Sequence, residues 1–391
     1  MQNNASRTVR RATLRRGNGM TIGANSGDSH YFEPPDLYSS RLPKELADRM
    51  PRSVHAADGA SETIYIDGKT FERDLPRIFT IKGKGGRTLV DDLRHAGDSD
   101  MNVRRKDLDE EGIWAELVYP SVGLWNSMIE DPNLVREAVK VANDWCAEVQ
   151  NENVRHVMPA QVSHLDVNDA VAEVERAAGL GLKAVNLPCE TPKDIPGFNR
   201  DYWDPLWDCL VDTGMVIACH TGTNAQAGDD PVHFRGPGAG AANYVWSSVP
   251  GIFMAAFMVS SGVLDKRPEL KMIISEAGAS WVPFLGDRLN EAVRQHSDYI
   301  RDNLSRLPKE ILFSQVYASF QHDESAIPAL TAMGYNNVMW GSDYPHIEGT
   351  FGHTQKTLHE LFDDQPAEVT DRITRGAFLE CFPHVGMPPQ A

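Results

Sequence analysis

The sequence of 391 residues lacks long apolar runs, paired cysteines and an excess of positive charge, and each absence excludes a class of protein. No apolar run reaches the roughly 18 residues that cross a bilayer, because the longest, residues 249–259, is interrupted by Pro250 and Gly251. The five cysteines are scattered with no Cys-x-x-Cys pair, a pattern typical of a reduced, intracellular protein. The net charge of -17 argues against nucleic acid as a partner. We therefore expect a cytoplasmic protein with no membrane partner and no nucleic-acid partner.

Residues 1–21 contain five arginines and no acidic residue, which predicts a flexible basic tail. Arg-rich, acid-poor N-termini are also typical of transit peptides, so this alternative stays open. We assign residues 22–391 to a single domain. Within it, two runs of alternating residues, 62–66 and 69–72, flank Asp67-Gly68, a pair that favours the tight turn of a β-hairpin. We interpret residues 51–110 as an insertion after the first strand that forms part of a lid or a subunit contact.

From Gly112 onward, predicted strands and helices alternate along the chain. The predicted strands include residues 113–120, 154–160, 184–188 and 215–220, and the helices include residues 134–151, 169–180 and 202–213. Further strands near Asp28 and at residues 270–274, 316–320 and 338–340 bring the number to at least eight. Alternation implies parallel strands with right-handed crossovers, so we predict an α/β fold, a (β/α)8 TIM barrel with the hairpin-containing insertion after its first strand. A doubly wound open sheet is the alternative, but no Gly-x-Gly-x-x-Gly follows the first strand.

Side chains of the types that bind metals occur at the ends of five predicted strands. They are Asp28, His30 and Glu33 at the first strand, then His220, Glu276 and His322, and finally Asp343 with His346. Asp28 and His30 are two residues apart, so they lie on the same face of an extended strand. Taken singly, each residue has a structural explanation, such as a turn aspartate, a core histidine, an ion pair or a helix cap. Because the carboxyl ends of the strands form the active face of a TIM barrel, the set together predicts a metal site.

Imidazole and carboxylate donors without a thiolate suit a divalent metal such as Zn, Mn or Fe. Such an ion lowers the pKa of a bound water to about 7 and binds carboxylate or carbonyl groups. A mononuclear site needs about three or four protein ligands, whereas two ions would use Glu276 as a bridge and His322 as an additional ligand. Both one ion and two ions are compatible with this set of residues. The three further ligand-type side chains, Glu276, His322 and His346, exceed what a single ion uses and favour a site that can hold two.

Six motifs resemble the amidohydrolase superfamily, and within it the amidohydrolase-related group that includes aminocarboxymuconate semialdehyde decarboxylase. They are Asp28-Ser29-His30-x-x-Glu33-Pro34, residues 108–113, Tyr119-Pro120, His220-Thr221-Gly222, residues 275–283, and Gly341-Ser342-Asp343-Tyr344-Pro345-His346. The resemblance extends from Asp28 to Phe382. It implies a (β/α)8 barrel that forms a homodimer or a related hetero-oligomer. It also implies a metal held by Asp28, His30, His220 and Asp343.

Two positions depart from the pattern of these decarboxylases. The first strand carries Asp-x-His rather than His-x-His, and Glu276 stands where the decarboxylases have a catalytic histidine. We therefore expect a hydrolase or lyase that uses a metal-activated water on a small molecule with a carboxylate or carbonyl group. Glu276, Asp343 and His322 are the expected catalytic residues. The alternatives are a dinuclear non-haem iron oxygenase (Fe/Fe or Mn/Fe) on the same barrel and a ligand-binding barrel without catalysis.

Overall fold

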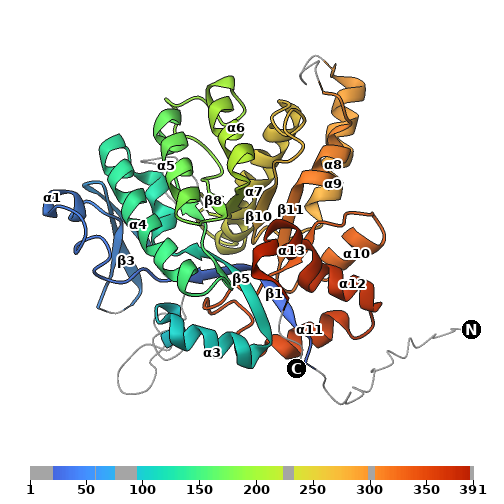
Figure 1. The fold of residues 1–391 in the computed structure, drawn as a ribbon, viewed down its shortest axis with the longest axis horizontal. Helices are drawn as coiled ribbons and strands as arrows, with labels where there is room; N and C mark the ends of the chain where they lie inside the picture. Colours follow the sequence, from blue (N-terminus) through green and yellow to red (C-terminus); the bar gives the residue numbers. More distant parts are fainter. Residues whose placement is uncertain (1–20, 58, 75–94, 223–232, 298–303, 388–391) are drawn as a thin grey trace, which may run out of the picture.

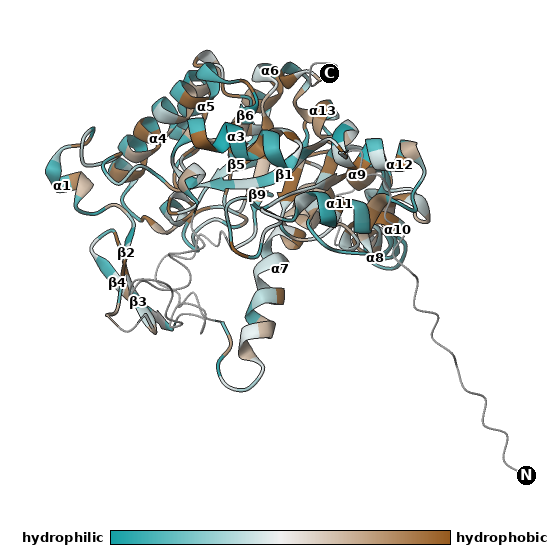
Figure 2. Cartoon of the chain, turned by 90° about the horizontal axis from the view of Figure 1, so that it is seen from below, coloured by the Kyte–Doolittle hydropathy of each residue, from teal (hydrophilic) through white to brown (hydrophobic). Residues whose placement is uncertain are grey.

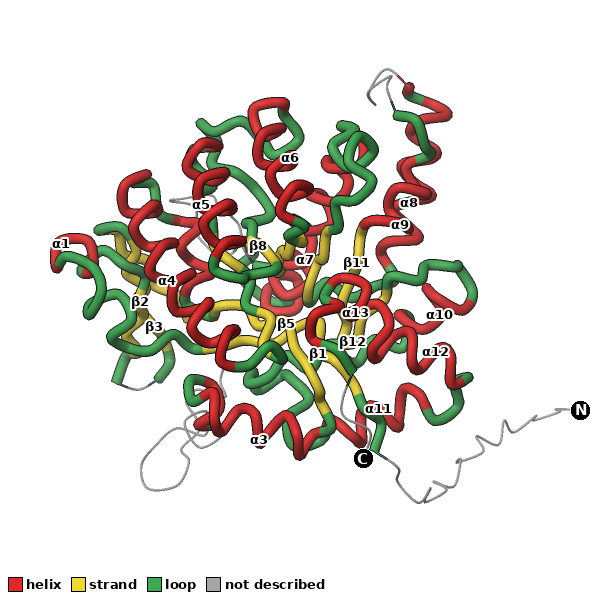
Figure 3. Tube along the Cα trace, viewed as in Figure 1, coloured by secondary structure: helices red, strands yellow, loops and turns green. Residues whose placement is uncertain are grey.

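The computed structural model describes residues 21–57, 59–74, 95–222, 233–297 and 304–387. The predicted basic tail, apart from its last residue, and residues 75–94 of the predicted insertion lie outside these ranges. At the centre of the molecule, short parallel strands are surrounded by helices (Figure 1, Figure 3). The strands are β1 (Ala24–Tyr31), β5 (Ile113–Pro120), β6 (His156–Val157), β7 (Ala160–Gln161), β8 (Ala184–Asn186), β9 (Val216–His220), β10 (Met272–Ser275), β11 (Val316–Phe320) and β12 (Val338–Trp340).

These strands form a closed ring. Parallel pairing gives the order β1–β5–β6 in one sheet and β7–β8–β9–β10–β11–β12 in the other. Only residues 158–159 separate β6 from β7, and the second of them is a proline, which has no N–H for the ladder. At the other seam, a parallel bridge joins Ser29 to Tyr344, and the N–H of Asp343 donates to the carbonyl oxygen of Asp28 (2.8 Å). Because β6 and β7 occupy one strand position, the described residues supply eight positions, which confirms the predicted (β/α)8 barrel.

Alternation along the strands separates two apolar layers. Ala115, Leu117 and Tyr119 of β5 point into the barrel, where they meet inward residues of β9, β10, β11 and β12. The alternate residues, such as Val118, pack outward against the helices. Helix α13 (Ala377–Cys381) contributes to the inner cluster and closes the end of the barrel at which the strands begin. The opposite end, where the strands terminate, is therefore the open one.

The helices on the outside of the barrel follow the strands along the chain. They are α3 (Met101–Glu111), α4 (Pro132–Glu152), α5 (Val167–Gly179), α6 (Asp204–Thr213), α7 (Ala239–Ser260), α8 (Trp281–Gln295), α9 (Pro308–Gln315), α10 (Ala326–Thr331), α11 (Thr354–Phe362) and α12 (Ala367–Asp371). The observed α4, α5 and α6 agree closely with the helices predicted from apolar spacing. Their N-termini show why they begin where they do: the Asp131 carboxylate accepts from an N–H of the first turn of α4, and Asp166 does the same for α5.

The predicted hairpin is present in the insertion. Strand β3 (Ser61–Ile66) pairs antiparallel with β4 (Lys69–Asp74). The turn between them places Asp67 at φ 49° and Gly68 at φ 77°, the left-handed conformation that a two-residue hairpin requires. Strand β2 (Arg52–His55) adds a third member on the other side of β3. The last part of the segment interpreted as an insertion forms α3, which contacts β5 and belongs to the wall of the barrel.

Helix α7 is longer and more apolar than the sequence analysis allowed. Among the described residues, it is the one helix with the length and composition of a membrane span, with 22 residues and a window of mean hydropathy 1.3. The search for apolar runs missed it because the helix continues through Pro250 and Gly251. A single such helix is weak support for a membrane span, and residues near its C-terminal end, such as Met254 and Met258, are buried against the barrel. Its first half extends away from the barrel (Figure 2).

Candidate metal centre

Strand β1 delivers two donor groups to the open end of the barrel. Asp28 and His30 are fully buried, and their spacing of two residues places both on the inner side of the strand. The Nδ1 atom of His30 lies 3.4 Å from the carbonyl oxygen of Pro120, so Nε2 is the atom that faces the site. That Nε2 lies 3.7 Å from Oδ1 of Asp28. The backbone of β5 thus sets the orientation of the imidazole.

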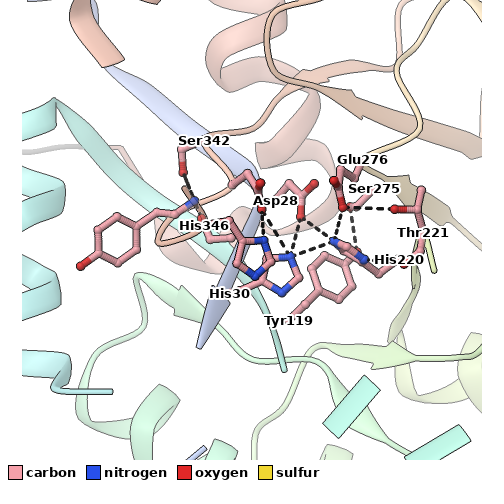
Figure 4. Close-up of polar contacts among 12 residues, drawn as sticks. Asp28, His30, Tyr119, His220, Thr221, Ser275, Glu276, Ser342 and His346 are labelled. Atoms are coloured by element: carbon pink, nitrogen blue, oxygen red, sulfur yellow. Dashed lines mark hydrogen bonds and ion pairs between the residues drawn. The ribbon is translucent and has the colours of Figure 1, made fainter. Parts of the chain in front are cut away.

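Strand β9 ends at His220, whose ring approaches that of His30 (Figure 4). Its Nδ1 lies 2.8 Å from the carbonyl oxygen of Thr221. The Nε2 atoms of His30 and His220 lie 2.8 Å apart, and Nε2 of His220 lies 3.4 Å from Oδ1 of Asp28. When both Nδ1 atoms donate to backbone carbonyls, both Nε2 atoms of the neutral rings carry lone pairs. Two lone pairs that face each other repel, and a positive charge between them, either a proton or a metal ion, removes this repulsion.

Asp343 follows β12 and brings a second buried carboxylate to the site. Its Oδ1 lies 3.5 Å from Nε2 of His30. The Nδ1 atom of His346 lies 2.9 Å from the same oxygen, and the ring of His346 stacks on that of His30 with centroids 4.1 Å apart. The barrel seam between β1 and β12 therefore places one carboxylate, that of Asp343, and one further imidazole, that of His346, beside His30.

Glu276 follows β10 and lies on the other side of His220. Its Oε2 lies 3.3 Å from Nε2 of His220 and accepts a hydrogen bond from Oγ1 of Thr221 (3.1 Å). The backbone N–H of Glu276 donates to Oγ of Ser319 (3.1 Å). Glu276 and Asp343 have φ of 60° and 53°, a region that residues other than glycine rarely occupy. Such backbone strain is typical of functional sites, where it turns a side chain toward its target.

Burial controls the protonation of the site. It raises the pKa of the Asp28, Asp343 and Glu276 carboxyl groups, because desolvation penalises their charged forms. It lowers the pKa of His30 for the same reason. Burial also acts to lower the pKa of His220, but the charges of Asp28 and Glu276 outweigh it and raise that pKa to about 10. A buried site that gathers three carboxyl groups favours a bound positive charge.

The donor set fits a divalent ion. The four carboxylate oxygens of Asp28 and Asp343 are buried and accept no hydrogen bond within the described part of the chain, although Oδ1 of Asp343 lies 2.9 Å from Nδ1 of His346. Buried carboxylates without partners are costly unless a cation compensates them. The donors form two groups, Asp28–His30–His220 and His30–Asp343–His346, in each of which the ligand atoms lie within 4.8 Å of one another. Carboxylate and imidazole donors of this kind suit Zn, Mn or Fe.

Three predicted donors, Glu33, Glu276 and His322, lie outside both groups. Glu276 contacts His220 as described above, whereas the other two have their contacts elsewhere. Glu33 accepts hydrogen bonds from the backbone N–H groups of Val122 (3.1 Å) and Gly123 (2.6 Å), and burial raises the pKa of its carboxyl to about 7. His322 is exposed and stacks on His353, with ring centroids 6.1 Å apart. Within the described ranges, neither residue joins a group that could hold a metal. Their assignment as ligands, and that of His322 as a catalytic residue, stays a prediction.

Two residues that hold the donors in place were not identified from the sequence. Thr221 contacts Glu276 through its hydroxyl and His220 through its carbonyl oxygen. Arg104 is fully buried, and its Nη1 donates to the carbonyl oxygen of His30 (2.6 Å). Thr221 lies in a motif with a predicted ligand, which is a signal that could have been used. Arg104 lies in a strongly charged segment, where no pattern distinguishes it from its exposed neighbours.

A comparison with curated proteins finds a relative of moderate similarity. The decarboxylase yanB of Aspergillus niger is 24% identical over 283 residues, which correspond to 67% of this chain and 72% of that protein.

Solved structures share the fold over almost the whole chain. An amidohydrolase from Mycobacterium avium subsp. paratuberculosis K-10 has a TM-score of 0.73 at 20% identity and covers 94% of this chain and 99% of its own. The 5-carboxyvanillate decarboxylase LigW from Sphingomonas paucimobilis has a TM-score of 0.65 at 18% identity, with coverages of 93% and 99%. A 5-carboxyvanillate decarboxylase from Novosphingobium aromaticivorans, solved with bound manganese, has a TM-score of 0.64 at 16% identity, with coverages of 93% and 97%.

The model of the Amidohydrolase family matches residues 107–378. This range includes β5 and all later strands of the barrel, together with His220, Glu276 and Asp343. Because the match spans more than half of the sequence, the chain belongs to the amidohydrolase family.

Proposed function

We propose that this protein is a metal-dependent hydrolase or lyase that acts on a small molecule with a carboxylate or carbonyl group. The observation that carries the proposal is the set of four buried oxygens of Asp28 and Asp343, which accept no hydrogen bond within the described residues and lie beside two facing imidazoles. A fully buried pair of carboxylates is costly unless protons or a cation compensate the charge, and a divalent ion compensates both at once. In this proposal Asp28, His30, His220 and Asp343 hold the ion. When bound, a divalent ion would polarise a substrate oxygen and lower the pKa of a water to about 7.

The remaining polar groups of the site are placed to handle protons. Glu276 is 17% exposed, so its carboxylate reaches the open end of the barrel as well as His220. The hydroxyl of Thr221 fixes one carboxylate oxygen and leaves the other available to exchange a proton with water or substrate. His346 lies on the opposite side of His30 and is partly exposed. An acid–base pair formed by Glu276 and His346 would therefore flank a substrate at the metal.

The relatives support a substrate that carries a carboxylate. The curated relative is named a decarboxylase, and two of the similar structures are 5-carboxyvanillate decarboxylases, one of which contains manganese. A divalent ion with a substrate carboxylate as ligand is consistent with both the hydrolase and the lyase reactions. Glu276 in place of the histidine of the resembling decarboxylases is the reason to keep hydrolysis in the proposal.

The experiment compares purified protein with and without metal on two panels of substrates. Hydroxybenzoates and other aromatic carboxylates are assayed for CO2 release, and small esters, lactones and amides for acid release. The proposal predicts turnover in at least one panel that EDTA abolishes and Zn²⁺ or Mn²⁺ restores. Turnover that survives EDTA would contradict it. Bound metal without turnover of any compound would favour a ligand-binding barrel instead.

A dinuclear non-haem iron oxygenase is the second candidate. It is favoured by the two donor groups that share His30, because together with Glu276 they offer more ligands than one ion uses. Two ions about 3.5–4 Å apart would need a bridging carboxylate, and the short contacts of Asp28 and Asp343 with His30 place both carboxylates within reach. Two equivalents of iron with substrate-dependent O2 consumption would support this candidate, and a single equivalent of metal would contradict it.

A further inference from the structure

Arg104 makes contacts with three parts of the barrel from its position on α3. Its guanidinium forms a bidentate ion pair with Glu116 of β5, with N···O distances of 2.6 and 2.7 Å. Its Nη1 donates to the carbonyl oxygen of His30 on β1 (2.6 Å). Its Cζ lies 4.6 Å from the ring centroid of Tyr344, which follows Asp343. One buried side chain thus joins β5 to both segments that carry the candidate ligands.

The carbonyl oxygen of His30 accepts its hydrogen bond from Arg104 and not from a backbone N–H of the segment that follows Asp343. Beyond the seam between β1 and β12, Pro345 has no N–H to donate. The N–H of His346 donates to the carbonyl oxygen of Asp343 (2.9 Å) and is therefore engaged elsewhere. Arg104 supplies a charged donor at this point, and charge-assisted bonds are stronger than those between neutral groups. The backbone at His30 is consequently held by the guanidinium of Arg104.

A second residue of α3, Asp107, also holds the side chain of Tyr344. Asp107 lies one helical turn after Arg104 and accepts a hydrogen bond from the hydroxyl of Tyr344 (2.6 Å). Its Oδ2 also lies 2.7 Å from Nδ1 of His95, just before α3. The ring of Tyr344 is therefore held on its face by Arg104 and at its hydroxyl by Asp107. Because Tyr344 directly follows Asp343, these contacts limit the movement of the Asp343 backbone.

We propose that Arg104 is a positioning residue of the metal centre, which supports the backbone hydrogen bonds between β1 and the Asp343 segment and so helps to fix the distance between the β1 ligands and Asp343. The inference rests on the proposed function, since it presupposes that these residues bind a metal. Arg104 contacts the backbone of His30 and the ring of Tyr344 rather than the candidate ligand atoms, so we assign it a positioning role and not that of a ligand. Loss of groups that orient metal ligands typically weakens metal affinity by about 10–100-fold.

The test distinguishes a positioning role of Arg104 from the alternative that Arg104 only balances the negative charge of Glu116. Removal of Arg104 alone would leave the buried Glu116 carboxylate with His156 as its remaining side-chain partner and destabilise the fold. The double variant Arg104→Met/Glu116→Gln removes both charges, and Glu116→Gln alone keeps the bond from Arg104 to His30. For each protein, the dissociation constant for Zn²⁺ is measured by competition with a fluorescent chelator, and Tm is measured without metal.

The proposal predicts a folded double variant that binds Zn²⁺ about 10–100-fold more weakly, while Glu116→Gln stays close to wild type. Wild-type affinity in the double variant would overturn it, as would an equal loss in Glu116→Gln. If the double variant does not fold, Arg104→Lys retains the charge but lacks the planar fork that contacts Glu116 and His30 together. Arg104→Lys is then expected to bind Zn²⁺ at least about tenfold more weakly, and wild-type affinity in this variant would equally overturn the proposal.

Arg155 offers a matched control at the other end of the barrel. Its Cζ lies 4.6 Å from the ring centroid of Trp114, and its guanidinium donates to the carbonyl oxygen of Ile113 (3.1 Å). Arg155→Met is expected to leave Zn²⁺ affinity unchanged. A wild-type protein that binds no Zn²⁺ would remove the proposed function itself. Strong binding by both wild type and the double variant would remove only the role of Arg104.

Discussion

The Nε2 atoms of His30 and His220 face each other 2.8 Å apart, although the two residues are 190 positions apart in the sequence. Each ring is held by a backbone carbonyl at its Nδ1, which belongs to Pro120 for His30 and to Thr221 for His220. Neither imidazole can turn away without losing that contact. The barrel therefore holds two nitrogen donors at one point before any ion binds, and this arrangement is the basis of the predictions that follow.

Removal of one ligand is expected to remove the metal while the fold persists. His220→Ala and Asp343→Asn should each lose bound metal and activity, because a ligand set loses affinity when one member is removed. The barrel should remain folded, since its apolar layers do not include these side chains. Metal content and circular dichroism are the two measurements. Asp323→Asn, an exposed carboxylate after β11, is the control and should retain metal. Full metal content in His220→Ala would disprove its assignment.

A variant of His322 distinguishes a metal site without this residue from a two-ion site in which His322 is a ligand. Because its ring is exposed and stacks on His353, His322→Ala should leave the number of metal ions per chain unchanged. His353→Ala serves as the control for loss of the ring contact alone. If His322→Ala instead loses one of two equivalents of metal, His322 is a ligand of a second ion, and the dinuclear candidate gains support.

Glu276 is expected to serve the reaction more than the binding of metal. Glu276→Gln keeps an oxygen that accepts from the hydroxyl of Thr221 but cannot carry a proton as a carboxyl group does. We expect retention of one equivalent of metal and a fall in kcat of about 10²–10⁴-fold, the usual contribution of a general acid or base. Glu324→Gln, which changes an exposed carboxylate, should have wild-type kcat. An unaltered kcat in Glu276→Gln would exclude it as the acid–base group.

Glu33 is expected to make stability depend on pH. Its carboxyl has a pKa of about 7 in the folded protein because of burial, compared with about 4.3 in an unfolded chain. The stabilising contribution of the protonated group is complete below pH 4.3 and is lost as pH rises to 7. Relative to Glu33→Gln, the wild-type free energy of unfolding should fall by at most about 4 kcal/mol across this interval. Urea unfolding of both proteins between pH 4.5 and 8 is the measurement, and parallel profiles would contradict the prediction.

The positions of the candidate ligands on strands could be predicted because these residues lie inside regular structure. His30 and His220 are residues of β1 and β9, so period-two alternation fixes the side of the strand on which each lies. Glu276, Asp343 and His322 lie beyond strand ends, where the path of the loop decides the direction of the side chain. The positive φ of Glu276 and Asp343 turns them into the site, and no sequence pattern predicted that conformation. His322 also follows a strand, two residues after the end of β11, but its side chain is exposed.

Tertiary contacts account for what the sequence did not reveal. The segment around Arg104 is rich in charge, and its only buried arginine is distinguished by contacts with residues from three distant segments. The predicted strand over residues 154–160 is divided into β6 and β7 by Pro159, which interrupts pairing without ending the barrel wall. The apolar patterns were sufficient to predict the barrel. The hydrogen bonds and ion pairs around the site could not be predicted in the same way, because they depend on which charged side chains come into contact after folding.

The central claim, that Asp28, His30, His220 and Asp343 hold a divalent metal, is tested most directly by metal analysis of the purified protein. The protein is freed of metal, dialysed against Zn²⁺, Mn²⁺ or Fe²⁺, and analysed by mass spectrometry of its metal content beside His220→Ala. The account predicts at least one equivalent of one of these ions per wild-type chain and none in the variant. A wild-type protein that retains none of the three ions would contradict it.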